Sequence, residues 1–147
     1  MKTITHAAFS LLISILIIGL VDDWTIFLSL SIIGALLPDI DSRKSSIGRM
    51  TRPISDILNL GEHRGALHSI FTGAALSLAI YVFSTDAALG FIVGYGSHLS
   101  LDMMTHSGIP IMWPLRYRLK GMIKTGSAVE YAFLIAVLSL IGAILLA

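Results

Sequence analysis

The side chains that could do chemistry in this chain are histidines and carboxylates, because its 147 residues include five histidines and no cysteine. Without a thiol there is no disulfide, no thiol nucleophile and no cysteine-based zinc site. A metal ion would therefore have to be held by imidazole and carboxylate groups, which suit zinc, manganese or iron(II). The histidines are His6, His63, His68, His98 and His106.

The strongest local pattern is the pair His98 and Asp102, which lies near the end of an apolar stretch. Residues four apart project from the same face of a helix. Ionisable side chains inside a membrane span are costly and generally mark a functional site. An interfacial or capping role would explain a lone histidine at a helix end, but it does not explain this pair.

Two further segments carry paired residues of the same kinds. Asp39 and Asp41 follow a proline that ends an apolar stretch, so they are expected in extended or turn backbone, where i,i+2 side chains share a side. Near His63 and His68 lies Gly65, which suits a backbone that approaches a ligand closely. Alone, either pair could belong to an ordinary loop. Together with the pair in the apolar stretch and His6, they predict a shared metal site.

The elements that must position these residues belong to a very apolar chain. Hydrophobic residues make up 55% and charged residues 13%, and the mean hydropathy is +0.86. A soluble domain carries about 25% charged residues, and most residues of a small domain touch water. These figures exclude a disordered chain, a coiled coil and a nucleic-acid-binding tail. They predict a membrane protein.

Five apolar stretches approach the roughly 20 residues that a membrane span requires. They predict an all-α, polytopic bundle of about five transmembrane helices, in one membrane-embedded domain over residues 1–147, with a cytoplasm-facing metal site. The first stretch is expected to be retained, since another apolar run follows it at once. Short polar turns imply antiparallel hairpins. The expected spans are residues 4–21, 24–37, 66–83, 87–104 and 128–147, with longer cytoplasmic loops over 39–65 and 105–127.

The charges predict how these spans are oriented. All ten Lys and Arg residues lie in the N-terminal segment or in the two longer loops. The opposite side carries only Asp22, Asp23 and Asp86. The positive-inside rule therefore places the N-terminus and both loops in the cytoplasm and the C-terminus outside. On this topology the histidines and their neighbouring aspartates gather near the cytoplasmic ends of the spans.

Some of the cations could bind a phosphate group. Arg64 lies between two histidines, and a guanidinium binds phosphate through two parallel hydrogen bonds. Lys44 is expected to assist it. Arg49 and Arg52 are better explained by the positive-inside rule, within a predicted amphipathic surface helix over residues 47–58. The segment MWPLRYRLK mixes aromatic and basic residues as membrane-interface anchors do.

The fourth stretch contains two glycines whose spacing indicates close helix packing. The run IVGYGS at residues 92–97 resembles the filter of potassium channels. However, the threonine position of that filter is Ile92 here, and no separate pore helix precedes it. Gly90 and Gly94 are therefore interpreted as a small-residue face that lets this span approach a neighbour.

Five motifs in this order carry a resemblance to a known family. They are THAAFS, LLPDIDSRKS, EHRGALHS, GYGSHLSLDMMTHSG and MWPLRYRLK. The chain resembles the YdjM family over about residues 5–120, and members of that family are described as bacterial inner-membrane, metal-dependent hydrolases. The family looks like a membrane-embedded relative of the zinc-dependent phospholipase C and single-strand nuclease group.

The resemblance implies a metal centre with one or two divalent ions, zinc being expected first and manganese or iron as alternatives. Asp102 would bridge two ions, and Asp41 would lie behind the ligands or act as a base. His106 lies beyond the HxxxD motif and is a less certain ligand. The implied ligands are His6, Asp39, His63 or His68, His98 and Asp102.

The function expected from these features is hydrolysis of a phosphoester in a lipid or lipid-linked molecule at the cytoplasmic leaflet of the bacterial inner membrane. Asp41 or a metal-bound Asp would take a proton from a metal-activated water, and Lys44, Arg64 and Ser69 would hold the phosphate. Membrane lipids are the expected partners, and no nucleic acid is expected. The alternative is a divalent-metal carrier or sensor without hydrolysis. A carrier needs a path to the outer side, but the third and fifth spans carry no charge apart from Glu130 near one end.

Overall fold

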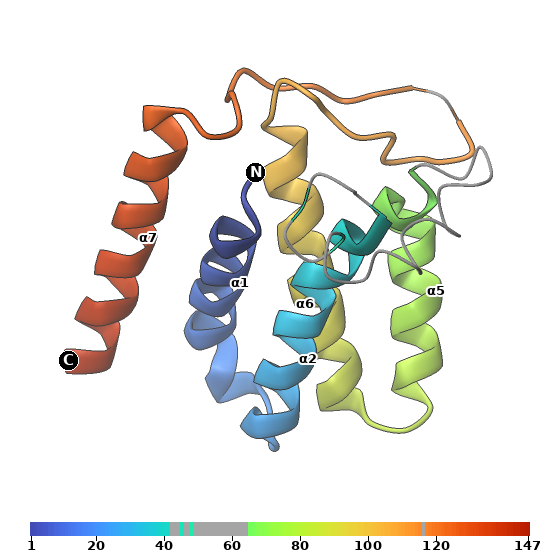
Figure 1. The fold of residues 1–147 in the computed structure, drawn as a ribbon. Helices are drawn as coiled ribbons and strands as arrows, with labels where there is room; N and C mark the ends of the chain where they lie inside the picture. The colour runs from blue at the N-terminus through green and yellow to red at the C-terminus, as the bar shows by residue number, and fades with distance from the viewer. Residues whose placement is uncertain (42–44, 46–47, 49–64, 116) are drawn as a thin grey trace.

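The computed structural model describes residues 1–41, 45, 48, 65–115 and 117–147, and of Asp41 only the backbone. Within these residues the fold is all-α, as predicted, with five α-helices, three 3₁₀ turns and no β-strand (Figure 1). The 3₁₀ turns cover Ile18–Leu20, Leu37–Asp41 and Ala66–His68. The α-helices are α1 (Thr3–Ile17), α2 (Trp24–Leu36), α5 (Ile70–Tyr81), α6 (Thr85–Met103) and α7 (Ala128–Leu146).

Each of the five predicted apolar ranges overlaps one of these helices. By length and composition, two helical segments of the described chain could cross a membrane, Thr3–Leu20 and Ala128–Leu146. The apolar segments Trp24–Ile40 and Ile70–Tyr81 are shorter. The helices are therefore where the hydropathy predicts them, while the five crossings remain a prediction. The predicted surface helix over residues 47–58 falls almost wholly outside the described residues.

Polar residues between the apolar stretches begin the helices. Asp23, Ser69 and Ser84 precede α2, α5 and α6, and each side chain accepts a hydrogen bond from a backbone N–H of the first turn. Such caps satisfy donors that have no partner inside the helix. The backbone N–H of Asp23 also donates to the Asp86 carboxylate at 2.7 Å. The turns before α2 and α6 therefore lie side by side, at the end of the bundle opposite the N-terminus (Figure 1).

Helix α6 is the central element of the bundle, and it contacts α1, α2 and α5. Successive helices run in opposite directions, so that the N-terminus and the α6–α7 connection lie at the same end (Figure 1). Helix α7 lies at the edge and packs against α1, with Val137 and Ile141 buried against Ala8 and Leu12. The end shared by the N-terminus and that connection is where the candidate site forms.

Polar side chains lie inside the bundle, while large apolar side chains cover its outside. Ser31 of α2 is fully buried, and its Oγ lies 2.7 Å from Ser10 Oγ and 2.6 Å from Ser14 Oγ of α1. In contrast, Leu78 of α5 is 68% exposed and Ile135 of α7 is 65% exposed. Small hydroxyl residues between helices and apolar residues outside are the arrangement expected in lipid.

The predicted glycine face of α6 is confirmed. A Cβ added at Gly90 would collide with the carbonyl of Phe27, and one at Gly94 with the carbonyl of Ser31, both on α2. Gly34 of α2 lies against the α6 backbone in the same way. Because no side chain separates them, the backbones of α2 and α6 approach closely. This contact brings the C-terminal end of α2 to the histidine of α6.

Candidate metal centre

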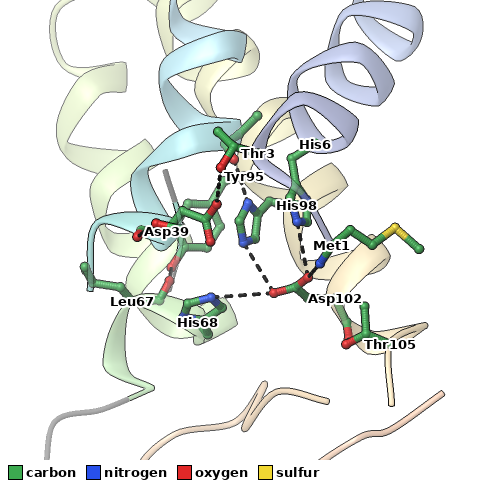
Figure 2. A network of polar contacts seen from close by, with 12 residues as sticks. Met1, Thr3, His6, Asp39, Leu67, His68, Tyr95, His98, Asp102 and Thr105 are labelled. Atoms are coloured by element: carbon green, nitrogen blue, oxygen red, sulfur yellow. Dashed lines mark hydrogen bonds and ion pairs between the residues drawn. The ribbon is translucent and has the colours of Figure 1, made fainter. Parts of the chain in front are cut away.

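Five of the residues predicted as metal ligands meet at one end of the bundle (Figure 2). His6 comes from the first turns of α1, and His98 and Asp102 come from the last turns of α6. Asp39 lies in the 3₁₀ turn after α2, and His68 ends the 3₁₀ turn before α5. Four separate segments therefore deliver imidazole and carboxylate groups to one place.

The distances between the donor atoms suit a shared metal ion. His6 Nε2 lies 3.2 Å from Asp102 Oδ1, while His98 Nε2 and His68 Nε2 lie 3.6 and 3.7 Å from Asp102 Oδ2. Zinc bonds of about 2.1 Å at tetrahedral angles separate neighbouring ligand atoms by roughly 3.4 Å. The donors are therefore spaced as the ligands of an ion would be. One oxygen of Asp102 lies near His6, and the other lies near His68 and His98.

The donors form two overlapping groups. His6, His98 and Asp102 offer ligand atoms that lie within 4.8 Å of one another, and so do Asp39, His68 and His98. His98 belongs to both groups, but it has one free ring nitrogen, because its other nitrogen is occupied as described next. Because one nitrogen binds a single ion, His98 could serve an ion in only one of the two groups, whereas Asp102 offers two carboxylate oxygens.

The orientation of the His98 ring is set by the backbone of α2. Its Nδ1 lies 2.6 Å from the carbonyl oxygen of Ala35. A carbonyl oxygen only accepts hydrogen bonds, so Nδ1 carries a proton and donates it, and Nε2 is the ring nitrogen that could bind a metal. Nε2 lies toward Asp102. A ligand histidine held through its second nitrogen in this way is typical of metal sites.

The buried ring nitrogens test whether a metal fits. His6 and His98 are 0% exposed, and their rings are stacked with centroids 3.9 Å apart. Both ring nitrogens of His6, and Nε2 of His98, make no hydrogen bond to the described part of the chain. Leaving a buried polar atom without a partner costs about 1–3 kcal/mol. A metal ion bound by one ring nitrogen of His6 and by Nε2 of His98 would remove that cost for those two atoms, so the residues fit such an ion.

The other donors are also held by neighbouring groups. The hydroxyl of Thr3 donates to Asp39 Oδ2 at 3.2 Å (Figure 2). The turn that carries His68 is fastened by Tyr95 of α6, whose hydroxyl lies 2.6 Å from the carbonyl oxygen of Leu67. The same hydroxyl lies 3.1 Å from the carbonyl oxygen of Ser69. These contacts fix the approach of two segments that have no regular helix at the site.

The start of α1 is held by a buried carboxylate of α7. Glu130 is 1% exposed and accepts from the backbone N–H of Lys2 at 2.5 Å and from the hydroxyl of Thr5 at 3.0 Å. Its second oxygen accepts from the N–H of Gly126 at 2.6 Å. These bonds fix the first turn of α1, on which His6 lies. The amino group of Met1, in the same segment, donates to Asp102 Oδ1 at 2.7 Å and forms an ion pair with it.

A cavity of about 620 Å³ opens beside the cluster. It is lined by Asp39, His68 and Asp102 and by residues of the α6–α7 connection. Ligand pockets typically measure about 300–1,000 Å³. The cluster is therefore buried on its helix side, where the two stacked rings lie, and open on the side of the connection.

Several predicted site residues lie elsewhere or outside the described part of the chain. His106 follows the end of α6, is exposed and belongs to neither donor group. Ser69 is fully buried, and its hydroxyl caps α5 and donates to the carbonyl of Trp113 at 3.3 Å, so its position indicates a structural role. The side chain of Asp41, and all of Lys44, His63 and Arg64, lie outside the described residues.

Sequence reasoning missed the residues that support the cluster. Tyr95 precedes His98 by three residues, and this helical spacing was the available signal for it. Glu130 is the lone acidic residue of the fifth apolar stretch, a position that generally marks a role. Nothing in the sequence marks the carbonyl of Ala35, since every residue has a backbone carbonyl.

Comparisons with known proteins place the chain in a family. The family model described as "YdjM inner membrane protein" matches residues 1–146. Inner membrane protein YdjM of Escherichia coli (strain K12) is 37% identical over 106 residues, which cover 67% of this chain and 54% of that protein. The uncharacterized protein YvsG of Bacillus subtilis (strain 168) is 34% identical over 103 residues, covering 67% of this chain and 64% of YvsG.

The chain spans about half the length of the first of these relatives and somewhat less than two thirds of the second. No solved structure matches it. The family match covers nearly every residue of the chain, including all four segments that meet at the cluster. This chain therefore belongs to the YdjM family of inner membrane proteins.

Proposed function

We propose that the chain is a membrane-embedded, metal-dependent hydrolase that cleaves a phosphoester in a lipid or lipid-linked substrate at the cytoplasmic leaflet. The observation that carries this proposal is the meeting of His6, Asp39, His68, His98 and Asp102 beside a cavity, with three buried ring nitrogens that lack hydrogen bonds within the described chain. A purely structural role for these groups would leave those nitrogens without hydrogen bonds, at a cost.

The ligand set supports zinc, in one or two ions, with manganese or iron as alternatives. When bound, such an ion lowers the pKa of a coordinated water toward about 7 and polarises a phosphoryl oxygen. The chain itself contributes the orientation of the ligands. Ala35 keeps the His98 ring in one tautomer, and Thr3 and Tyr95 fasten the segments that carry Asp39 and His68.

Substrate would reach the cluster through the cavity, because the opposite side is closed by the buried rings of His6 and His98. The roles expected for Asp41 as a base, and for Lys44 and Arg64 at the phosphate, are part of the proposal. They rest on the positions of these residues in the motifs.

The proposal includes five membrane crossings with the cluster on the cytoplasmic side. Support comes from the alternating direction of the helices and from the adjacency of the turns at Asp23 and Asp86 (Figure 1). All ten cations lie in the N-terminal segment and in the two long connections, as the positive-inside rule requires. A reporter fused after Ala147 that is active only outside the cytoplasm is expected. Activity of a cytoplasm-only reporter at that position would contradict five crossings.

The decisive experiment measures metal and hydrolysis on the same preparation. Protein purified in mild detergent is expected to contain one or two equivalents of a divalent metal by elemental analysis. It is expected to release phosphate or headgroup from at least one member of a panel of phospholipids and lipid phosphates. Metal without hydrolysis of any panel member, together with metal flux in proteoliposomes, would instead support the carrier. Absence of bound metal after zinc reconstitution would contradict both functions.

A further inference from the structure

The cavity beside the cluster is lined by residues whose chemistry the metal ligands do not explain. The hydroxyl-bearing residues Thr105, Ser107 and Thr125 line it, and so does Arg118. Among the Lys and Arg residues that the structure describes, Arg118 alone lines this cavity. The same cavity is therefore lined by metal-type residues, by a cation and by hydroxyl-bearing residues.

The backbone around Arg118 is held in place by hydrogen bonds. The next residue, Leu119, exchanges two backbone hydrogen bonds with Ile109, at 3.0 and 3.1 Å. Ile109 is 4% exposed and packs in a buried cluster with Phe91 and Tyr95 of α6. Arg118 is therefore attached to a backbone that is anchored in the core, although its own side chain is exposed.

The same connection is fastened to the end of α6 that carries Asp102. The N–H of Gly121 donates to the carbonyl of Thr105 at 2.9 Å, and the N–H of Ile123 donates to the carbonyl of Met104 at 3.0 Å. A Cβ at Gly121 would collide with the backbone of Met104, so the approach is close. The connection that carries Arg118 is thus tied directly to the helix end that carries a metal-type carboxylate.

The charge of Arg118 is not neutralised by any carboxylate of the described chain. A cation that served only membrane orientation could lie anywhere on this side of the bundle. Lys120 shows that alternative, because it is exposed in the same connection and does not line the cavity. Arg118 instead borders the space that a substrate would occupy.

We propose that Arg118, assisted by the hydroxyls of Ser107 and Thr125, binds the phosphate group of the substrate in this cavity. The inference rests on the proposed hydrolase function and names the residue that would recognise its substrate. A guanidinium presents two parallel donors to a phosphate, and hydroxyls supply further donors. The ligand class is a phosphate monoester or diester, whether it is a lipid headgroup or a soluble phosphate.

The test is a binding measurement that does not require turnover. Purified protein is titrated calorimetrically with inorganic phosphate, with and without added zinc, for the wild type, Arg118→Lys, Arg118→Ala and Lys120→Ala. We expect Arg118→Ala to weaken phosphate binding at least about tenfold, as loss of a charge-assisted bidentate contact would. The phosphate affinity of Arg118→Lys should lie between those of the wild type and Arg118→Ala, and that of Lys120→Ala should match the wild type. Zinc content and unfolding temperature should be unchanged in all variants.

Two results would overturn the proposal: phosphate binding by Arg118→Ala equal to that of the wild type, or loss of zinc or of folding in both Arg118 variants. Wild-type protein that binds phosphate through Arg118 but hydrolyses no substrate would refute the hydrolase and leave this site standing. A parallel titration with phosphatidic acid in mixed micelles distinguishes the source. A larger effect of Arg118→Ala on the lipid than on inorganic phosphate indicates a headgroup, and equal effects indicate a soluble phosphate.

Discussion

The Nδ1 of His98 lies 2.6 Å from the carbonyl oxygen of Ala35, and this bond joins the candidate metal centre to the packing of two helices. The carbonyl belongs to α2, whereas the ring belongs to α6. The two backbones are close enough for this bond because Gly94 presents no side chain to α2, where the nearest atoms are those of Ser31 and Ala35. Helix packing and ligand orientation are therefore one structural feature here.

The first prediction is that Gly94→Ala harms both stability and metal binding. The added methyl would meet the α2 backbone, and overpacking of this kind costs typically about 1–3 kcal/mol. Separation of α2 from α6 would also weaken the bond to His98, and loss of such support lowers metal affinity about 10–100-fold. Unfolding in detergent and zinc titration measure the two effects.

A matched control lies on the same helix. A Cβ at Gly96 meets nothing within 4 Å, so Gly96→Ala should leave zinc affinity unchanged and stability equal or slightly higher. If Gly94→Ala behaved like Gly96→Ala in both measurements, the link between helix packing and the His98 ring would be wrong.

The second prediction distinguishes His98 and Asp102, in the last turns of α6, from His106, which follows the end of that helix. His98→Ala and Asp102→Ala should each lose most of the bound metal, since both residues belong to the cluster. His106→Ala should retain it, because His106 is exposed and lies outside both donor groups. Elemental analysis after zinc reconstitution measures the difference. Equal loss in all three variants would show that His106 is a ligand.

The third prediction concerns Tyr95. Its hydroxyl donates to the carbonyls of Leu67 and Ser69, which flank the residue His68. Tyr95→Phe would leave these carbonyls without that donor, at a cost of about 1–3 kcal/mol, and would loosen the turn that carries His68. We expect a lower unfolding temperature and weaker zinc binding. Tyr117→Phe is the control, because Tyr117 is 70% exposed. Similar values for both variants would refute a role for Tyr95 in holding His68.

The fourth prediction is a pH effect at the opposite end of the bundle. The hydroxyl of Thr25 and the backbone N–H groups of Ile26 and Thr25 donate to Asp23, and they lower the pKa of its carboxyl below its ordinary value of 3.8. A lowered pKa stabilises the folded state above pH 3.8, and that contribution is lost as the pH falls through the folded-state pKa. The wild type should therefore unfold at a higher temperature than Asp23→Ala at neutral pH, with a smaller difference in acid.

Unfolding scans between neutral pH and the acid range test this. Asp23→Asn keeps a capping oxygen without a titrating charge. The difference in unfolding temperature between Asp23→Asn and Asp23→Ala should therefore not depend on pH. If the difference in unfolding temperature between the wild type and Asp23→Ala stayed constant down to acid pH, the charge of Asp23 would contribute nothing to the cap.

The positions of the helices could be predicted from the sequence by itself. The apolar stretches that became α1, α2, α5, α6 and α7 are marked by local composition, and the residues before three of them are polar caps. The glycine face of α6 was equally local, because a small residue at every fourth position is visible without a structure. The pairing of His98 with Asp102 follows from helix periodicity alone.

The charge pattern and the apolar stretches predicted that the histidines and aspartates gather at one end, but only the tertiary structure determined which of these side chains contact one another. His6 stacks on His98, and Asp39 lies near His68, although nothing in the local sequence specifies either contact. The tautomer of His98 depends on a backbone carbonyl, which carries no sequence signal. Arg118 lines the cavity because its neighbour Leu119 pairs with Ile109. Hydropathy and spacing are properties of short stretches of chain, whereas these contacts depend on how closely whole helices and their connections pack.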